Sequence, residues 1–388
     1  MIRRSLRVCK KRTTEKNPET NHKKDALPLD LLLEILIRLP ATSVTSFMLV
    51  SKAWANTIRS KDFLRSFPYP SSPCRLLIAL QGRDRNTGRQ SCCFFSSSSS
   101  LSSSTTSFLS RITNPSSSNR PGWLTAYYVN GLMSIGQVIC NPITGKSITL
   151  PKLLKTACNP RLAMRFFGYD PANNQYKVLS LSPTPNSTPA RVKAQVFTLG
   201  GAKPKPNSWR LIDCPIPHAL RSRGLCIDGS VYYIAGGTGL MQMSLMRFDL
   251  NSEKFDIFAS VSEAVRALRP RRPLNLINYH GKVAIAIQPI RTASRIDVRV
   301  FQAGKQDELE VSFHDLPQLH MHIKGVVSHT GEVVFASYGS PEAHVFHYDP
   351  NNSANKLTRI NIQVDANRNM FSEANYFLGF QESYVVVS

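Results

Sequence analysis

A short apolar run near the start of the chain has the polar spacing of a single helix. Between Leu29 and Leu39, eight of eleven residues are Leu or Ile. The three exceptions recur at i, i+4 and i+8, which on a helix of 3.6 residues per turn forms one narrow polar stripe: Asp30, Glu34 and Arg38. Pro28 suits a first helical turn and Pro40 ends the run. The pattern predicts a short helix that is apolar over most of its circumference.

The residues that follow continue the helical spacing. Apolar side chains recur there at intervals of three and four: Val44, Phe47, Val50, Trp54 and Ile58. Together with the first run they predict a helical hairpin or three-helix unit of roughly 40 residues, a size at which a core is marginal by itself. We expect the surplus apolar surface to be covered by another part of the chain or by a second protein.

After Phe63 the pattern changes from helical to strand-like, and it repeats. Four glycines each open a β-rich run, at separations of 98, 52 and 50 residues: Gly131, Gly229, Gly281 and Gly331. The wide first interval contains an unmarked unit around "GYDPANNQYKVLSL". Hairpin patterns with Asx, Pro or Gly in the turn recur within the units. Four short strands every ~50 residues are typical of β-propeller blades with a kelch-like period.

The ends of the β region supply material for one more blade. Five units lie between residues 131 and 365, and strands near 76–96 are expected to pair with the terminal "YFLGFQESYVVVS" as a sixth. Such pairing would close the ring and remove exposed sheet edges. The predicted fold is a small all-α module followed by an all-β, propeller-like domain.

Composition divides the chain further. Residues 1–24 are basic and predict a disordered tail, 25–66 form the helical module, and 67–388 form the propeller-like domain with a Ser-rich surface loop at 96–118. The formal charge is +23, which attracts polyanions non-specifically, but no signature of a specific nucleic-acid reader is present. No membrane span and no secretory signal are expected, so we expect the nucleus, the cytoplasm or both.

Catalytic and metal-binding motifs are missing from the sequence. The chain has no GxSxG, HExxH, P-loop or GxGxxG in the required context. The adjacent pair Cys92 and Cys93 reads best as part of a strand, and no Cys or carboxylate completes a zinc spacing around the paired histidines: His320, His322, His344 and His347. We expect no cofactor, no metal site and no catalytic residue.

The helical module resembles an F-box. The resemblance is carried by Leu27-Pro28, by "EIL" at 34–36, by "RLP" at 38–40, by "VSKAW" at 50–54, and by Ile58 and Phe63, with Ser51 where many members have cysteine. It implies docking on a Skp-type adaptor, and through it on cullin and RING subunits. The motif places these residues at the adaptor interface: Leu27, Pro28, Leu32, Ile35, Leu36, Leu39, Pro40, Val50 and Trp54. For Leu36 and Trp54, a role in the core of the module is an equal alternative.

The β region resembles the F-box associated domain of plant F-box proteins. The segments "VICNPITGKSITLPK", "FFGYDPANNQYKVL" and "LMRFDLNSEKFDIF" stand in the order and spacing of that family. Together the two resemblances imply a non-catalytic receptor subunit of an SCF ubiquitin ligase, which presents an unidentified protein target for ubiquitination. The alternatives are a propeller-fold enzyme and a basic nucleic-acid-binding scaffold. The sequence identifies neither the target nor the residues that bind it.

Overall fold

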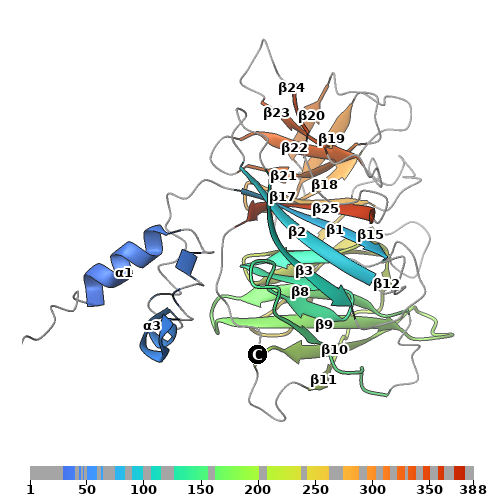
Figure 1. The fold of residues 1–388 in the computed structure, drawn as a ribbon. Helices are drawn as coiled ribbons and strands as arrows, with labels where there is room; N and C mark the ends of the chain where they lie inside the picture. The colour runs from blue at the N-terminus through green and yellow to red at the C-terminus, as the bar shows by residue number, and fades with distance from the viewer. Residues whose placement is uncertain are drawn as a thin grey trace, which may run out of the picture.

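The protein consists of a small helical module beside a six-bladed β-propeller, as predicted (Figure 1). The structure is a computed structural model. It describes residues 29–39, 43–44, 47, 50–58, 63, 75–83, 90–98, 106–114, 126–155, 162–200, 208–236, 243–261, 274–287, 295–302, 309–314, 321–327, 331–337, 344–349, 357–361 and 371–380. The predicted tail at 1–24 lies outside these residues.

The helical module contains the predicted first helix, α1, at Leu29–Arg38, and a second helix, α3, at Lys52–Ile58. On α1, Glu34 and Arg38 of the predicted stripe are exposed, and Arg38 Nη2 lies 2.6 Å from Glu34 Oε1 one turn away. Helix α3 begins with a side-chain cap, because the backbone N–H of Trp54 donates to Ser51 Oγ at 3.2 Å. The residue that departs from the common F-box pattern therefore also starts this helix.

The propeller has six antiparallel sheets, which we call blades. The closing blade combines both ends of the domain in the order β25-β1-β2-β3: β25 Phe371–Phe380, β1 Arg75–Arg83, β2 Gln90–Ser98 and β3 Thr106–Asn114. The β4–β7 blade follows: β4 Ala126–Val129, β5 Leu132–Ile135, β6 Val138–Cys140 and β7 Ser147–Thr149. The β8–β11 blade is next: β8 Met164–Asp170, β9 Gln175–Pro183, β10 Val192–Thr198 and β11 Trp209–Ile212.

The remaining three blades complete the ring. The β12–β16 blade has five strands: β12 Ala219–Leu220, β13 Leu225–Ile227, β14 Ser230–Gly236, β15 Met243–Asp249 and β16 Phe255–Ser260. The β17–β20 blade has four: β17 Asn275–Tyr279, β18 Lys282–Ile287, β19 Ile296–Val300 and β20 Leu309–Phe313. The β21–β24 blade also has four: β21 Met321–Val326, β22 Val333–Ser337, β23 His344–Tyr348 and β24 Leu357–Asn361.

The ring closes through β25, which pairs with β1 along almost its whole length. The innermost strands touch in sequence around the ring: β4 with β8, β8 with β13, β13 with β17, β17 with β21, and β21 with β25. Tyr128 of β4 completes the circle by contacting Phe377 and Phe380 of β25. The predicted pairing of the early strands with the C-terminal strand is therefore confirmed.

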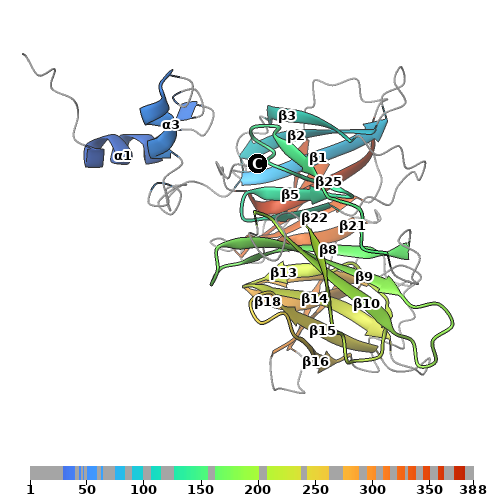
Figure 2. The same ribbon diagram turned by 90° about the horizontal axis from the view of Figure 1, so that it is seen from below.

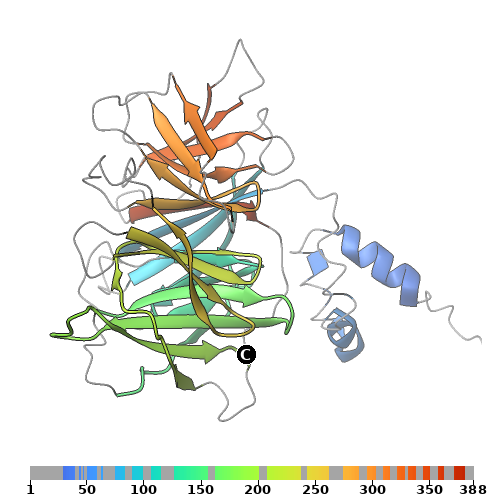
Figure 3. The same ribbon diagram turned by 180° about the vertical axis from the view of Figure 1, so that it is seen from behind.

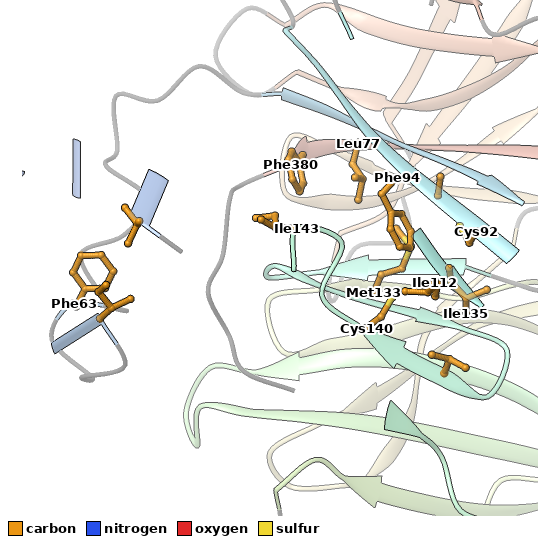
Figure 4. Close-up of a cluster of buried hydrophobic side chains, with 14 of the residues drawn as sticks. Phe63, Leu77, Cys92, Phe94, Ile112, Met133, Ile135, Cys140, Ile143 and Phe380 are labelled. Atoms are coloured by element: carbon orange, nitrogen blue, oxygen red, sulfur yellow. The ribbon is translucent and has the colours of Figure 1, made fainter. Parts of the chain in front are cut away.

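Buried apolar side chains fill every interface between neighbouring blades. Six clusters of described residues occupy the six interfaces. The adjacent Cys92 and Cys93 lie on opposite faces of β2 and belong to two different clusters, which confirms their prediction as strand residues. The first cluster joins Leu77, Phe94 and Phe380 of the closing blade to residues of β5 and β6 (Figure 4).

Tight turns at the predicted glycines connect the first two strands of several blades. At Asn130-Gly131 both residues have positive φ, and the same is true of His280-Gly281. Two consecutive residues with positive φ form the two-residue turn whose twist matches that of a hairpin. The unmarked unit is the β8–β11 blade, where Asn174 ends a longer turn with a φ of 51°.

The Ser-rich segment differs from the prediction. Instead of one surface loop at 96–118, residues up to Ser98 extend β2 and Thr106–Asn114 form β3. Backbone pairing with β2 places β3 at the outer edge of its blade, where small polar side chains are tolerated, and Ile112 still packs in the first cluster. Residues 99–105 and 115–118 lie outside the described part of the chain.

The two ends of the propeller are built differently. The β8–β9 turn points toward the side of the helical module, whereas the β9–β10 turn points away from it (Figures 1 and 2). Antiparallel pairing in the other blades repeats this alternation of turns, and Figure 3 shows the ring of blades from behind. Among the described helices, none is long and apolar enough to cross a membrane.

Candidate docking surface of the helical module

The module has a small core of its own. Leu36, Val44, Ile58 and Phe63 are each at most 1% exposed. Phe47 stacks on Trp54 with ring centroids 5.0 Å apart, and both rings pack against this core. The four core side chains belong to the same buried cluster as residues of the closing blade, and Figure 4 shows Phe63 on the module side of that cluster.

The predicted interface residues occupy three kinds of position. Ile35 is 51% exposed and Val50 is 68% exposed, so both present apolar side chains to the outside. Leu36 lies in the core, and three others are half-buried against it: Leu32, Leu39 and Trp54. Leu27, Pro28 and Pro40 lie outside the described residues. In this structure Leu36 therefore occupies the core position that was its alternative, while its role at an interface stays a prediction.

One exposed residue was missed by sequence reasoning. Leu31 is 49% exposed and lies one turn before Ile35 on α1. The i, i+4 spacing of these two residues, directly beside the stripe of Glu34 and Arg38, was the available signal. Exposed Leu and Ile on one short helix leave apolar area in contact with water, where burial of each side chain is worth about 1.5–3 kcal/mol.

The propeller holds several buried polar pairs that are satisfied internally. His218 lies between the carbonyl of Ile216, 2.8 Å from Nδ1, and the hydroxyl of Tyr233, 3.0 Å from Nε2. Burial lowers the pKa of His218, so the ring is neutral near pH 7. His347 lies 3.2 Å from Glu332 across β22 and β23, which confirms for this histidine the prediction of a strand residue satisfied by its neighbours.

A buried ion network joins two blades at the module side. Lys177 Nζ lies 3.3 Å from Asp170 Oδ2 and 3.0 Å from Glu253 Oε1, and it donates to the carbonyl of Leu250. Arg210 also pairs with Glu253. Burial raises the pKa of Asp170, but hydrogen bonds from Asn173 and Lys177 outweigh it and hold that pKa below its ordinary value. Every charge in this network has a partner, so we regard it as structural.

Comparisons with known proteins agree with this architecture. Residues 25–66 match the F-box domain, and residues 75–384 match the F-box associated beta propeller domain. Two Arabidopsis thaliana proteins that are provisionally named as F-box proteins are 37% and 42% identical to this chain. The first match covers 96% of this chain and 85% of the relative, and the second covers 84% and 92%.

The likeness to solved structures is weaker. The lectin of the fungus Aleuria aurantia, a six-bladed β-propeller, is 10% identical over 75% of this chain and 97% of its own, with a TM-score of 0.36. A likeness at that level carries no argument about function. The family matches and the plant relatives, by contrast, span both parts of the molecule, and the chain belongs to the F-box proteins with a C-terminal F-box associated β-propeller domain.

Proposed function

We propose that this protein is the substrate receptor of an SCF ubiquitin ligase. The module docks on a Skp-type adaptor and thereby joins cullin and RING subunits, and the propeller holds a protein target. The observation that carries the proposal is the exposure of Leu31, Ile35 and Val50 on a module that already has its own core. Exposed large apolar side chains that form a patch mark interaction sites in folded proteins.

The mechanism is tethering rather than bond chemistry. A target held on the propeller and a charged conjugating enzyme held through the adaptor share one complex, which raises the effective concentration of target lysines to about the mM range. No side chain of this chain has to act as a nucleophile, an acid or a base in that scheme. The nucleus, the cytoplasm or both are the compartments in which we propose that it acts.

A pull-down with a purified Skp-type adaptor tests the docking assignment. We expect Ile35→Asp and Val50→Asp each to weaken adaptor binding at least about tenfold, because a carboxylate replaces apolar area that the adaptor would cover. Asn56→Asp provides the matched control, since it places the same charge on an exposed polar position of α3. Unchanged binding of the Ile35 and Val50 double variant would show that the adaptor docks elsewhere.

Leu36 needs a different readout from its exposed neighbours. Because Leu36 is 1% exposed, Leu36→Asp buries an unpaired carboxylate and should unfold the module as well as abolish docking. Loss of helical circular dichroism together with loss of adaptor binding is the expected result. Retained helicity would mean that the side chain is less confined than the structure shows.

A further inference from the structure

One face of the β8–β11 blade changes character along its length. This face points toward the β4–β7 blade. Near the module side it is apolar and belongs to one buried cluster with Leu132 and Ile139: Phe167, Val178, Phe197 and Trp209. Toward the far end the same face becomes polar, and the strand registers align Arg165 with Ser180 and Ser180 with Gln195. Three adjacent strands thus present a row of polar side chains between two blades.

The side chains in the outer part of this polar row find their hydrogen-bond partners in a neighbouring segment. Gln195 bonds both backbone groups of Leu154, with its Oε1 accepting at 2.9 Å and its Nε2 donating at 3.3 Å. The indole N–H of Trp209 donates to the carbonyl of Pro151 at 2.9 Å. Residues 151–155, which leave the β4–β7 blade, therefore cover the outer strands of the row.

The inner part of the row lacks such hydrogen bonds. Among the described residues, Arg165 Nε and Ser180 Oγ are buried atoms without a hydrogen-bond partner, and Ser180 is 0% exposed whereas Arg165 is half-buried. Burial lowers the pKa of Arg165, and no carboxylate of the described residues acts on it. A part-buried guanidinium whose Nε has no partner opposes folding, and an anion that contacts the part-exposed Arg165 recovers some of that cost.

The surroundings of this pair indicate what kind of molecule brings the anion. Leu154 and Leu162 are exposed large apolar residues on either side of the connection to β8, at 41% and 54%. Lys152 and Lys155 are exposed on the same connection. Apolar and cationic side chains beside one guanidinium fit a protein segment that carries carboxylates next to leucine-like residues, because Arg binds a carboxylate through two parallel N–H donors.

We propose that Arg165 is an anion-binding position at which the propeller captures an acidic, leucine-containing segment of its target. The inference rests on the proposed function, because it assigns the far end of the propeller as the target-binding end. Ser180 lies beside Arg165 across two paired strands, but its side chain is fully buried, so the part-exposed Arg165 is the residue that meets the carboxylate. Leu154 and Leu162 then contact the apolar residues beside that carboxylate.

The test uses the full chain and a fluorescent peptide of sequence GLEELEELG, with GLQQLQQLG as its uncharged match. We expect the acidic peptide to bind at least tenfold more tightly than the amide peptide. Arg165→Met should weaken binding of the acidic peptide by about 10–100-fold, the loss of charge-assisted hydrogen bonds, while Ser180→Ala, at a fully buried position, should leave that binding unchanged. Arg165→Lys keeps the charge without the planar fork and should lose an intermediate amount.

Arg191→Gln is the matched control, since Arg191 is an exposed cation at the same end of the blade. If it lowers affinity as much as Arg165→Met, the peptide is attracted by the net positive charge and the proposal is wrong. Equal binding of the two peptides also overturns it. If a peptide with phosphoserine in place of glutamate binds more than tenfold more tightly than the acidic peptide, the preferred ligand is a phosphate rather than a carboxylate.

Adaptor binding separates this inference from the proposed function. Arg165→Met should bind the adaptor like the parent, because the polar row lies at the other end of the propeller from the module. Lost peptide binding with intact adaptor binding supports both proposals. If the parent binds the adaptor and ignores the acidic peptide, only the anion-binding position fails. If the parent binds the peptide and ignores the adaptor, only the docking assignment fails.

Discussion

The β8–β9 hairpin carries two cations with opposite surroundings. At the module side, the side chain of Lys177 is 5% exposed and has Asp170, Glu253 and a backbone carbonyl as partners. At the far end, Arg165 shares the same hairpin, and its buried Nε has no hydrogen-bond partner among the described residues. The same two strands position both cations. We therefore interpret the difference in their partners as a difference in role: the paired cation at the module side stabilises the fold, and the cation at the far end binds a ligand, as proposed above.

The backbone shows the same division. Two-residue turns such as Asn130-Gly131 and His280-Gly281 join strands at the module side. The stretches of sequence between one blade and the next are longer, for example residues 261–274 between β16 and β17 and 150–163 between β7 and β8. Short turns and compensated charges favour rigidity, whereas longer connections and an uncompensated charge favour recognition.

Removing the cation at the module side should have the largest effect on stability. Lys177→Met leaves Asp170 buried without its cation, so we expect the free energy of unfolding to fall by about 3–5 kcal/mol. Urea denaturation followed by intrinsic fluorescence measures the change. Lys193→Met, on an exposed position of β10, is the control and should change stability by less than about 0.5 kcal/mol. Similar losses in both variants would remove the distinction between the two ends.

A β-branched residue in a tight turn at the module side should have the next largest effect. Gly281 has a φ of 78° and an added Cβ would meet nothing within 4 Å. Gly281→Val should therefore cost about 1–2 kcal/mol through backbone strain alone. Thermal unfolding compared with Lys282→Val, the exposed next residue, isolates that strain. A variant as stable as the parent would show that the turn adapts without cost.

The same replacement at the far-end cation should change stability little and in the opposite direction. Arg165→Met removes a half-buried cation whose Nε has no hydrogen-bond partner among the described residues, so the propeller should be unchanged or up to about 1 kcal/mol more stable. Urea denaturation under the conditions used for Lys177→Met makes the comparison direct. A loss above about 2 kcal/mol would mean that Arg165 is a structural residue, and our interpretation that Arg165 of the polar row binds a ligand would be wrong.

Lowering the pH should slightly reduce the stability of the folded protein, because of His218 at the far end of the propeller. The pKa of His218 is lowered by burial, so the unfolded chain takes up the proton first and stability falls as the pH drops below about 6.5. Between pH 7.5 and pH 5.5 we expect this residue to account for about 1–2 °C of the decrease in Tm. His218→Gln should lack that component. An identical pH dependence in both proteins would show that His218 is protonated without cost.

The sequence predicted the parts of the fold that depend on local patterns. The narrow stripe of Glu34 and Arg38 predicted α1, and the turn glycines predicted the blades, because both signals lie within a few residues. Strand β3 was missed because Ser and Thr have little apolar signal and are held by pairing with β2 rather than by local preference. Local pattern also separates poorly between a buried and an exposed apolar residue, as Leu36 and Ile35 show.

Arg165 could not be identified from the sequence. Its significance depends on its register with Ser180, on the path of residues 151–155 across another blade, and on the lack of a nearby carboxylate. Each of these is a long-range property of the folded ring. The composition did not distinguish Arg165 either, because a chain with 48 Lys and Arg gives no reason to single out one of them.

Because β25 pairs with β1, the closing blade can be completed only late in the synthesis of the chain. Strand β1 is made early, but its inner neighbour emerges from the ribosome roughly 300 residues later. At 5–20 residues per second, the edge of β1 waits about 15–60 s before it is covered. Throughout that interval the nascent chain carries an open strand edge, so premature termination anywhere before residue 371 yields a product that chaperones or proteases must remove.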